Sequence, residues 1–286
     1  MIRPMMIAAA LLAAKAGASE KPAHLFILSG QSNMAAMNPK LGFEPEAARL
    51  FPDADIASIK IALSGQPIRH WVAEWNEIAQ KHGIDPAATR AKDKRQEPVH
   101  YQKILKQFAE LIRKHPDPAS VTFCWMQGER DAKENLDAAY YEALRQLVTN
   151  LRRDLKQPKM GFVIGRLSDF GKADDAPWQA VRDAQVKLAN DDALGAWVDC
   201  DDLNDKEKQG QTFNDLHYTV EGYELLGRRY VRQARAIIDG KAPAKDGRPL
   251  EWTVPQRAGF PASAPLVLTA RSRQTTGRPA PFVWIS

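Results

Sequence analysis

The chain has 286 residues, a formal net charge of +5, 44% hydrophobic residues and 26% charged residues, which is typical of a globular protein rather than a disordered or fibrous one. Its length suffices for one large α/β domain or two smaller ones, and no apolar run approaches the roughly 20 residues that a membrane-spanning helix needs. Two cysteines are too few for a disulfide framework or a structural zinc site.

The positive charge is concentrated at the two ends of the chain. Residues 1–18 contribute +2 and residues 241–286 contribute +5, which leaves −2 for residues 19–240. Nucleic-acid binding needs a basic surface on the folded domain, and an excess confined to the ends does not supply one. We therefore expect neither a nucleic-acid partner nor a membrane span.

The first 18 residues have the features of a signal peptide. Arg3 forms a positive n-region, an apolar stretch runs from Met5 to Ala14, and Ala16-Gly17-Ala18 fits the small-residue cleavage pattern. This pattern predicts export to the periplasm or the extracellular space, and an ordinary N-terminal helix is the alternative. In an oxidising compartment Cys124 and Cys200 could pair, although two buried thiols are equally compatible with the sequence.

Short apolar runs alternate with helical patterns between residues 22 and 240. The runs are continuously apolar, as in parallel strands buried on both faces, and they cover residues 24–30, 54–63, 121–127, 160–167 and 195–200. A period of 3.6 residues marks the helical segments, which lie around 104–112, 140–155, 176–190 and 220–239. The alternation predicts an α/β fold, a three-layer α/β/α sandwich with a parallel sheet of about five strands.

Residues 22–240 are thus predicted to form the working domain. Residues 241–286 are rich in Pro, Arg, Ser and Ala and lack helical periodicity, so they form a C-terminal extension to which the sequence assigns no role.

In a doubly wound fold the chemistry collects at the carboxyl ends of the strands. Ser32 follows the first strand in the segment GQSNM, where a tight turn into a helix would expose its hydroxyl as a nucleophile or make it a helix N-cap. Gly65 follows the second strand and either offers its N–H to an oxyanion or only completes a turn. Gln127 and Glu129 follow the third strand, as a candidate oxyanion donor and an acid at the edge of the site.

A serine nucleophile needs a histidine within reach and a carboxylate to orient that histidine. Of the six histidines in the chain, His217 and, more weakly, His70 lie where such a role is possible. Asp215, two residues before His217, strengthens the case for His217.

Three ordered motifs resemble those of the SGNH hydrolases. They are GQSNM near the N-terminus, WMQGERD in the middle and DLHYT followed by GYELLGRR near residue 229. The resemblance is to the branch that contains sialate O-acetylesterases and acetylxylan esterases, and it covers about residues 22–240. It implies a flavodoxin-like SGNH fold and a serine esterase.

The resemblance also implies roles for individual residues. Ser32 matches the family nucleophile and His217 its general base. The oxyanion donors would be the Ser32 amide, Gly65 and the side chain of Gln127. No metal or cofactor is implied.

One position departs from the pattern of the superfamily. The aspartate that usually stands three residues before the histidine is replaced by Asn214, and Asp215 stands only two before. Either Asp215 or Glu129 would then orient His217, with Asp215 slightly favoured.

The implied reaction is removal of O-acetyl groups from sialic acid or xylan-type glycans through an acetyl-enzyme. Candidate residues for the sugar cleft are Gln31, Arg69, Trp71, Asp169 and Trp178, and a core position is at least as plausible for the aromatic ones. Two other functions compete with this one. They are a carbohydrate-binding pseudoenzyme and an SGNH lipase or thioesterase acting on longer acyl chains.

Overall fold

The computed structural model describes residues 21–90, 98–170 and 175–249. The signal peptide expected at 1–18 lies outside the described residues, as does the part of the C-terminal extension from residue 250 onward.

A parallel five-stranded sheet forms the centre of the molecule, and it confirms the fold class expected from the sequence. The strand order is β2-β1-β3-β4-β5, and every neighbouring pair is parallel. The strands are β1 (Ala23–Gly30), β2 (Asp55–Ala62), β3 (Ser120–Met126), β4 (Gly161–Gly165) and β5 (Gly195–Val198). All eight residues of β1 are buried, which explains why its sequence is continuously apolar rather than alternating.

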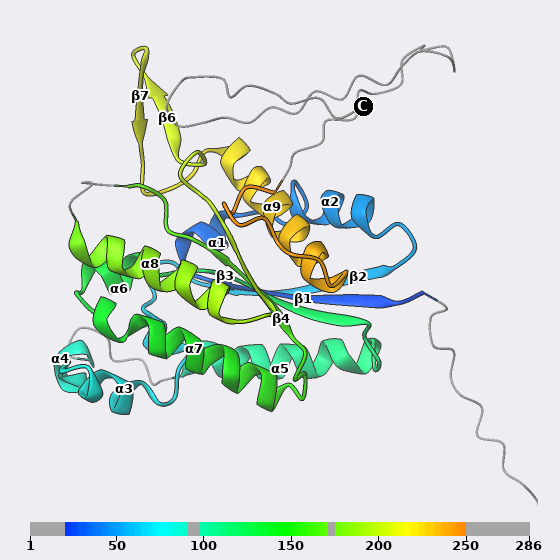
Figure 1. The fold of residues 1–286 in the computed structure, drawn as a ribbon, viewed down its shortest axis with the longest axis horizontal. Helices are drawn as coiled ribbons and strands as arrows, with labels where there is room; N and C mark the ends of the chain where they lie inside the picture. Colours follow the sequence, from blue (N-terminus) through cyan, green and yellow to red (C-terminus); the bar gives the residue numbers. More distant parts are fainter. Residues whose placement is uncertain (1–20, 91–97, 171–174, 250–286) are drawn as a thin grey trace, which may run out of the picture.

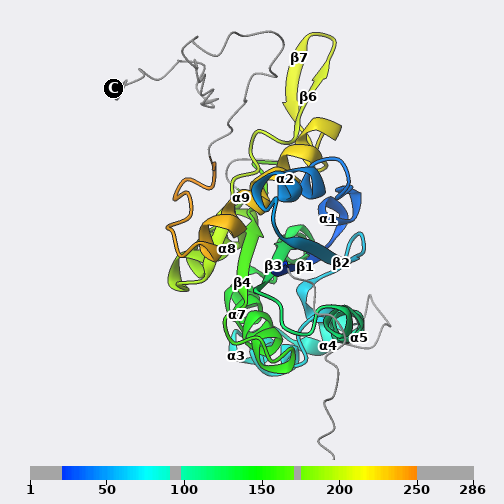
Figure 2. The same cartoon turned by 90° about the vertical axis from the view of Figure 1, so that its right-hand side faces the viewer.

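Helices cover both faces of the sheet, so the fold has three layers (Figures 1 and 2). One face carries α1 (Ser32–Ala36), α2 (Phe43–Leu50) and α9 (Val220–Ile238). The other carries α5 (Val99–Lys114), α7 (Asp137–Asp154) and α8 (Ala176–Asp191). Shorter helical segments connect them: η1 (Ile68–His70), α3 (Trp75–Lys81), α4 (Pro86–Arg90) and α6 (Glu129–Lys133).

The ends of the long helices follow ordinary capping chemistry. The Asp175 side chain accepts a hydrogen bond from the Trp178 amide at the start of α8, and Pro177 occupies the first turn. Thr219 accepts a hydrogen bond from the Gly222 amide at 2.9 Å and starts α9 in the same way. These caps fix where the two helices begin, beside the loops that carry Phe170 and His217.

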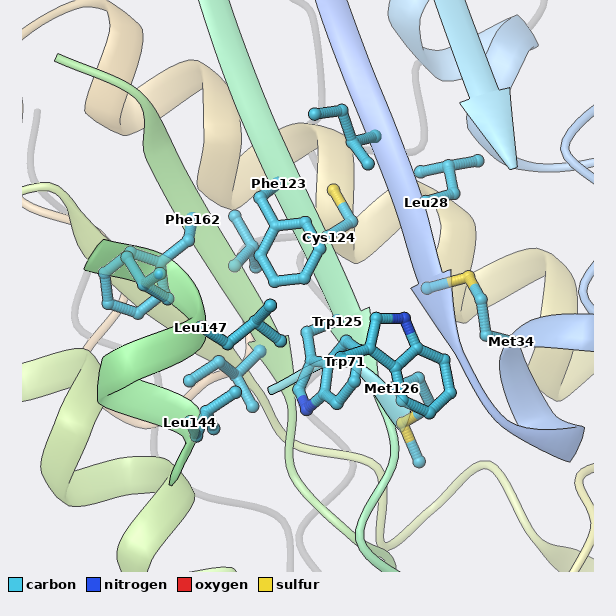
Figure 3. Packing of buried hydrophobic residues seen from close by; sticks show 14 of the residues in the cluster. Leu28, Met34, Trp71, Phe123, Cys124, Trp125, Met126, Leu144, Leu147 and Phe162 are labelled. Atoms are coloured by element: carbon cyan, nitrogen blue, oxygen red, sulfur yellow. The ribbon is translucent and has the colours of Figure 1, made fainter. Parts of the chain in front are cut away.

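Large aromatic side chains fill the layer between the sheet and α7 (Figure 3). Trp71 and Trp125 are both fully buried and meet edge to face, with ring centroids 5.0 Å apart. Leu144 and Leu147 of α7 lie beside Phe123 and Trp125 of β3 in this layer. This packing holds β3 firmly and so supports the turn that follows it.

Cys124 and Cys200 are both buried and both free thiols. Cys124 lies in β3 and Cys200 follows β5, with β4 between the two strands. Two strand spacings, about 9–10 Å, exceed the Cα separation that a disulfide tolerates. Of the two alternatives that the sequence left open, the structure has the buried thiols.

A two-stranded hairpin, which was not expected from the sequence, leads into the His217 loop. It consists of β6 (Asp205–Lys208) and β7 (Gln211–Asn214), which are antiparallel. Gln209 and Gly210 at its tip have positive φ angles of 54° and 75°, as a tight hairpin turn requires. The hairpin projects away from the sandwich (Figures 1 and 2).

The first residues of the C-terminal extension pack on the end of β5. The Gly247 carbonyl accepts a hydrogen bond from the Asp199 amide at 2.9 Å, and Arg248 pairs with the Asp199 carboxylate at 2.6 Å. Among the described residues, no helix is long and apolar enough to cross a bilayer.

Candidate active site

The loops that carry Ser32, Gly65 and Gln127 begin side by side at the carboxyl edge of the sheet. In the sheet register Gly30 pairs with both Ala62 and Met126, so β1, β2 and β3 end at the same level. The crossovers change direction between β1 and β3 in this strand order, and ligands of open α/β sheets bind at such a switch point.

Ser32 is the first residue of α1, in a turn that is tightly packed against β3. Gly30 has a φ of +148°, and a Cβ there would lie 1.9 Å from the Met126 carbonyl oxygen, so only glycine fits. The Gln31 amide donates to that same carbonyl at 2.9 Å. Gln31 is the N-cap residue, which removes the alternative that Ser32 is only a cap.

The end of α1 is fixed as well. Lys60 of β2 donates to the carbonyl oxygens of Ala35 at 2.8 Å and Met37 at 2.6 Å. The short helix that carries Ser32 is therefore tied to the sheet at both ends.

Ser32 and His217 line the same pocket, which has a volume of about 560 Å³. The pocket is lined by Gln31, Ser32, Ser64, Gly65, Glu129, Arg130, Lys133, Phe170, Asp175, Trp178, Leu216 and His217. His217 is exposed and Ser32 partly buried. Within the described part of the chain no hydrogen bond joins the Ser32 hydroxyl to the His217 imidazole, and in unliganded enzymes such bonds often tighten only when substrate binds.

Two backbone N–H groups in this pocket are available to an anion. Neither the Ser32 amide nor the Gly65 amide donates a hydrogen bond to another group in residues 21–90, 98–170 or 175–249. Gly65 has a φ of +69°, and a Cβ built there meets nothing within 4 Å, so the loop tip is open. The pair can serve a developing oxyanion, as an acyl-transfer site requires.

Asp215 is occupied by groups other than the imidazole. One of its oxygens pairs with Lys206 of β6 at 2.7 Å, and the other lies 3.5 Å from the His217 backbone amide. The Lys206 hydrogen bond is the main reason that the pKa of Asp215 is lowered. Asp215 therefore holds the backbone of the His217 loop.

Glu129 is nearly buried and keeps an oxygen available. Its Oε1 accepts a hydrogen bond from Asn33 Nδ2 at 2.9 Å, and its Oε2 has no hydrogen-bond partner among the described residues. Burial raises its pKa to about 7, although the hydrogen bonds from Asn33 and the backbone act the other way. An unused carboxyl oxygen on a residue that lines the same pocket as His217 makes Glu129 a candidate partner for an imidazolium.

Asn33 joins the three parts of the site, and the sequence analysis gave it no role. Its Nδ2 donates to Glu129 and to the Leu216 carbonyl at 3.1 Å, while its Oδ1 accepts from Tyr223 at 3.0 Å. The nucleophile turn, the acid and the histidine loop thus meet at one buried amide. Its position directly after Ser32 in GQSNM is the only signal that could have identified it.

Gln127 does not line the pocket, contrary to the expectation that its amide faces the oxyanion. Its Nε2 donates to the Gln66 carbonyl at 3.0 Å and to the Asp131 carboxylate, with Gln31 Oε1 at 3.3 Å. Both N–H groups are therefore used inside the protein. Gln127 therefore supports the loop that contains Gly65, through the Gln66 carbonyl.

Two of the five residues expected in the sugar cleft line the pocket, and three do not. Gln31 and Trp178 line it. Arg69 and Trp71 are fully buried. Inside the protein, Arg69 pairs with Glu134 at 3.0 Å and the Trp71 indole donates to Ser29 at 3.0 Å. Asp169 is exposed outside the pocket, and its carbonyl accepts from Asn214.

His70, the weaker alternative to His217, is a fully buried residue. Its Nδ1 lies 2.8 Å from Gln66 Oε1. In the residues that the structure describes, no group of three or more His, Cys, Asp or Glu side chains could hold a metal ion.

Several pocket residues were not among those expected from the sequence. Phe170 meets Trp178 edge to face with ring centroids 5.7 Å apart, and it forms an apolar wall with Trp178 and Leu216. Arg130 and Lys133 of α6 add positive charge on another side of the pocket. Their roles depend on where α6 and the loop after β4 fold, which no local pattern reveals.

Comparison with known proteins identifies the family. Residues 35–236 match the family described as SASA, carbohydrate esterase, sialic acid-specific acetylesterase. The chain belongs to this family. It is a carboxylic ester hydrolase of the SGNH superfamily and, by family, a carbohydrate acetylesterase.

Solved structures share this esterase's fold. A protein from Arabidopsis thaliana is 20% identical, with a TM-score of 0.53 over 76% of this chain and 98% of its own. NanS is 15% identical, with a TM-score of 0.51 over 77% of this chain and 97% of its own. XAC1771, described as a novel carbohydrate acetylesterase from Xanthomonas citri, is 16% identical, with a TM-score of 0.50 over 76% and 57%. No curated protein matches the sequence.

Proposed function

We propose that this acetylesterase removes O-acetyl groups from an acidic sugar through an acetyl-enzyme formed on Ser32. The observation that carries the proposal is the lining of one pocket by Ser32, His217 and two amides that donate to no other described group.

The chemistry is acyl transfer from the ester to water. The Ser32 hydroxyl attacks the acetyl carbonyl while His217 accepts its proton, and the oxyanion accepts hydrogen bonds from the Ser32 and Gly65 amides. As the tetrahedral intermediate collapses, His217 protonates the departing sugar alkoxide. His217 then removes a proton from water, which attacks the acetyl-enzyme, and the imidazolium returns that proton to the Ser32 oxygen as acetate is released.

Glu129 is the carboxylate that we propose to stabilise the imidazolium. Its unpartnered Oε2 supports this role, whereas both oxygens of Asp215 already face the Lys206 ammonium or the loop backbone. This choice reverses the slight preference for Asp215 stated from the sequence.

One charge of the pocket, the Lys133 ammonium, supports an acidic sugar rather than neutral xylan. Arg130 is engaged by Glu134 at 2.7 Å, and the carboxyl groups of Glu129 and Asp175 line the same pocket, where Asp175 also caps α8. Lys133 is exposed, lines the pocket and forms no ion pair among the described residues. A carboxylate on the substrate would complement this ammonium group, as a sialic acid would and xylan would not.

Acetate release from O-acetylated sialic acid and from acetylated xylan tests the choice of sugar. We expect at least a tenfold higher kcat/KM for the sialic acid, reduced several-fold by Lys133→Met at low salt because the charge contact is lost. Lys106→Met, an exposed lysine of α5, is the matched control and should change neither value. Equal rates on the two substrates, or no effect of Lys133→Met, would contradict the acidic-sugar assignment.

A lipase or thioesterase for longer acyl chains is the second candidate. The apolar wall of Phe170, Trp178 and Leu216 favours it, because an acetyl group alone does not fill about 560 Å³. Comparison of p-nitrophenyl acetate with p-nitrophenyl octanoate separates the two. The acetylesterase proposal predicts a higher kcat/KM for the acetate.

Export also remains a proposal. Detection of the mature N-terminus after Ala18 in an extracytoplasmic fraction would support it.

A further inference from the structure

Asp131 is a buried carboxylate that the proposed reaction does not use. It lies in α6, is fully buried and does not line the pocket. Its two oxygens accept hydrogen bonds from the Ile68 amide, at 3.2 and 3.0 Å, and Oδ2 also accepts from Gln127 Nε2. Burial raises the pKa of Asp131 to about 7, although the hydrogen bonds from Gln127 and the Ile68 amide and the charge of Arg69 act the other way.

These contacts hold the loop that contains Gly65. Asp131 binds the loop directly at Ile68, and Gln127 binds it at the Gln66 carbonyl. The Gln66 side chain closes the loop by donating to the Ser64 carbonyl at 2.9 Å. Nothing lies within 4 Å of a Cβ built on Gly65, so the tip is open on that side, and the hydrogen bonds at Ser64, Gln66 and Ile68 support the loop on either side of it.

The same network reaches the turn that contains Ser32. Gln31 Oε1 lies 3.3 Å from Gln127 Nε2 and accepts from the Arg130 amide at 3.2 Å. Gln31 directly precedes Ser32. Gln127 therefore contacts both the turn that carries the Ser32 amide and the loop that carries the Gly65 amide, although the two follow different strands.

We infer that Asp131 is a positioning residue that, together with Gln127, fixes the Gly65 amide relative to the Ser32 amide. The inference rests on the proposed function, because it assigns those two amides to the oxyanion. A preorganised pair of donors is effective only when its geometry is set before the charge develops. A buried carboxylate that accepts two N–H groups provides such a fixed point.

The substitution Asp131→Asn tests this role with little change in shape. The new amide turns an N–H toward either Ile68 or Gln127, so two donors meet where a donor and an acceptor met before. We expect kcat for acetyl ester hydrolysis to fall between about 10- and 100-fold, with KM changed less than about threefold, because only transition-state binding suffers. The rate at which a small neutral organophosphonate labels Ser32 should fall by a similar factor.

Asp192→Asn is the matched control, because Asp192 also accepts from a backbone amide, that of Leu194 at 2.9 Å, and pairs with Arg152 at 2.6 Å, away from the pocket. It should lower Tm without lowering kcat. If Asp131→Asn behaved like this control, losing Tm but keeping kcat within threefold of the wild type, the positioning role would be wrong.

A second variant covers the case in which Asp131→Asn does not fold. Gln127→Met removes the link to Gln66 and should also reduce kcat and the labelling rate at constant KM, while an unchanged kcat would contradict the inference. The labelling rate keeps this test separate from the choice of substrate. A wild type that is labelled but releases no acetate would count only against the proposed function, and a wild type that is not labelled would count against both.

Discussion

The Ser32 side, where we propose the nucleophile, and the His217 side, called the histidine side below, are built in different ways. Around Ser32, the side chains of Gln31, Gln127 and Asp131 are at most 4% exposed, and their hydrogen bonds join the loops after three strands. His217, in contrast, is exposed on a loop that follows a projecting hairpin. The difference suits the chemistry, since the oxyanion donors must stay fixed while the imidazole both accepts and donates a proton.

Polar contacts between the two sides run through Asn33, which donates to the Leu216 carbonyl at 3.1 Å and accepts from Tyr223 at 3.0 Å. The Asp215–Lys206 pair lies within the histidine side and holds the loop from its outer side. The acid that we propose to act in catalysis is the one on the buried side. Glu129 should be important for the reaction, and the Asp215 pair should matter mainly for the loop.

Replacing Glu129 and Asp215 separately should give the largest contrast. Glu129→Gln is expected to lower kcat by roughly 10³–10⁴, the range seen when a triad acid loses its charge. Asp215→Asn should cost less than about tenfold, because its contacts are with the backbone and a lysine. A larger loss from Asp215→Asn would return the role to Asp215, and equal small losses would exclude both residues.

The raised pKa of Glu129 should be visible in the stability of the protein. Burial raises that pKa from 4.5 to about 7, so the folded state binds this proton more tightly than the unfolded state does. The contribution to folding is fully present below pH 4.5 and is lost as the pH rises through 7. Glu129→Gln, which cannot ionise, should therefore gain up to about 3 kcal/mol relative to the wild type at pH 8.

Urea denaturation of both proteins at pH 4.5 and pH 8 measures this difference. The free energy of unfolding of Glu129→Gln, relative to that of the wild type, should be larger at pH 8 than at pH 4.5. A variant that is less stable than the wild type by the same amount at both would show that Glu129 titrates normally.

The hairpin should have the smallest effect. The side chains of Lys206 and Asp215 are each 34% exposed, so their ion pair should contribute no more than about 1 kcal/mol to stability. Lys206→Met should lower kcat about three- to tenfold, because the His217 loop loses its outer support. Lys208→Met, on the same hairpin and also exposed, serves as the control. Identical kcat values for the two variants would show that the hairpin does not position His217.

The sequence predicts the sheet and the motif loops well for an identifiable reason. Strands buried on both faces are continuously apolar, so β1, β3 and β4 are visible without knowledge of their neighbours. Parallel strands end at one edge, which brings Ser32 and Gly65 into one pocket although 33 positions separate them.

The orientations of polar side chains could not be predicted in the same way. Gln127 can donate in many directions, and its use inside the protein depends on the Gln66 carbonyl from another loop. Trp71 is a core residue whose indole donates a hydrogen bond to Ser29, and no local pattern reveals a partner 42 positions earlier in the sequence. The hairpin lacks the alternating apolar pattern of a strand pair, since its residues are mostly exposed and polar.

The central claim is that the acetyl-enzyme forms on Ser32 and that His217 is needed to form it. Its most direct test is to mix the protein with an acetyl ester, quench with acid at short times and map the acetyl group by mass spectrometry. The account predicts acetylation of the peptide that contains Ser32 in the wild type, and none in His217→Ala on the same timescale. Rapid release of acetate with no acetylated Ser32 at any time would contradict it.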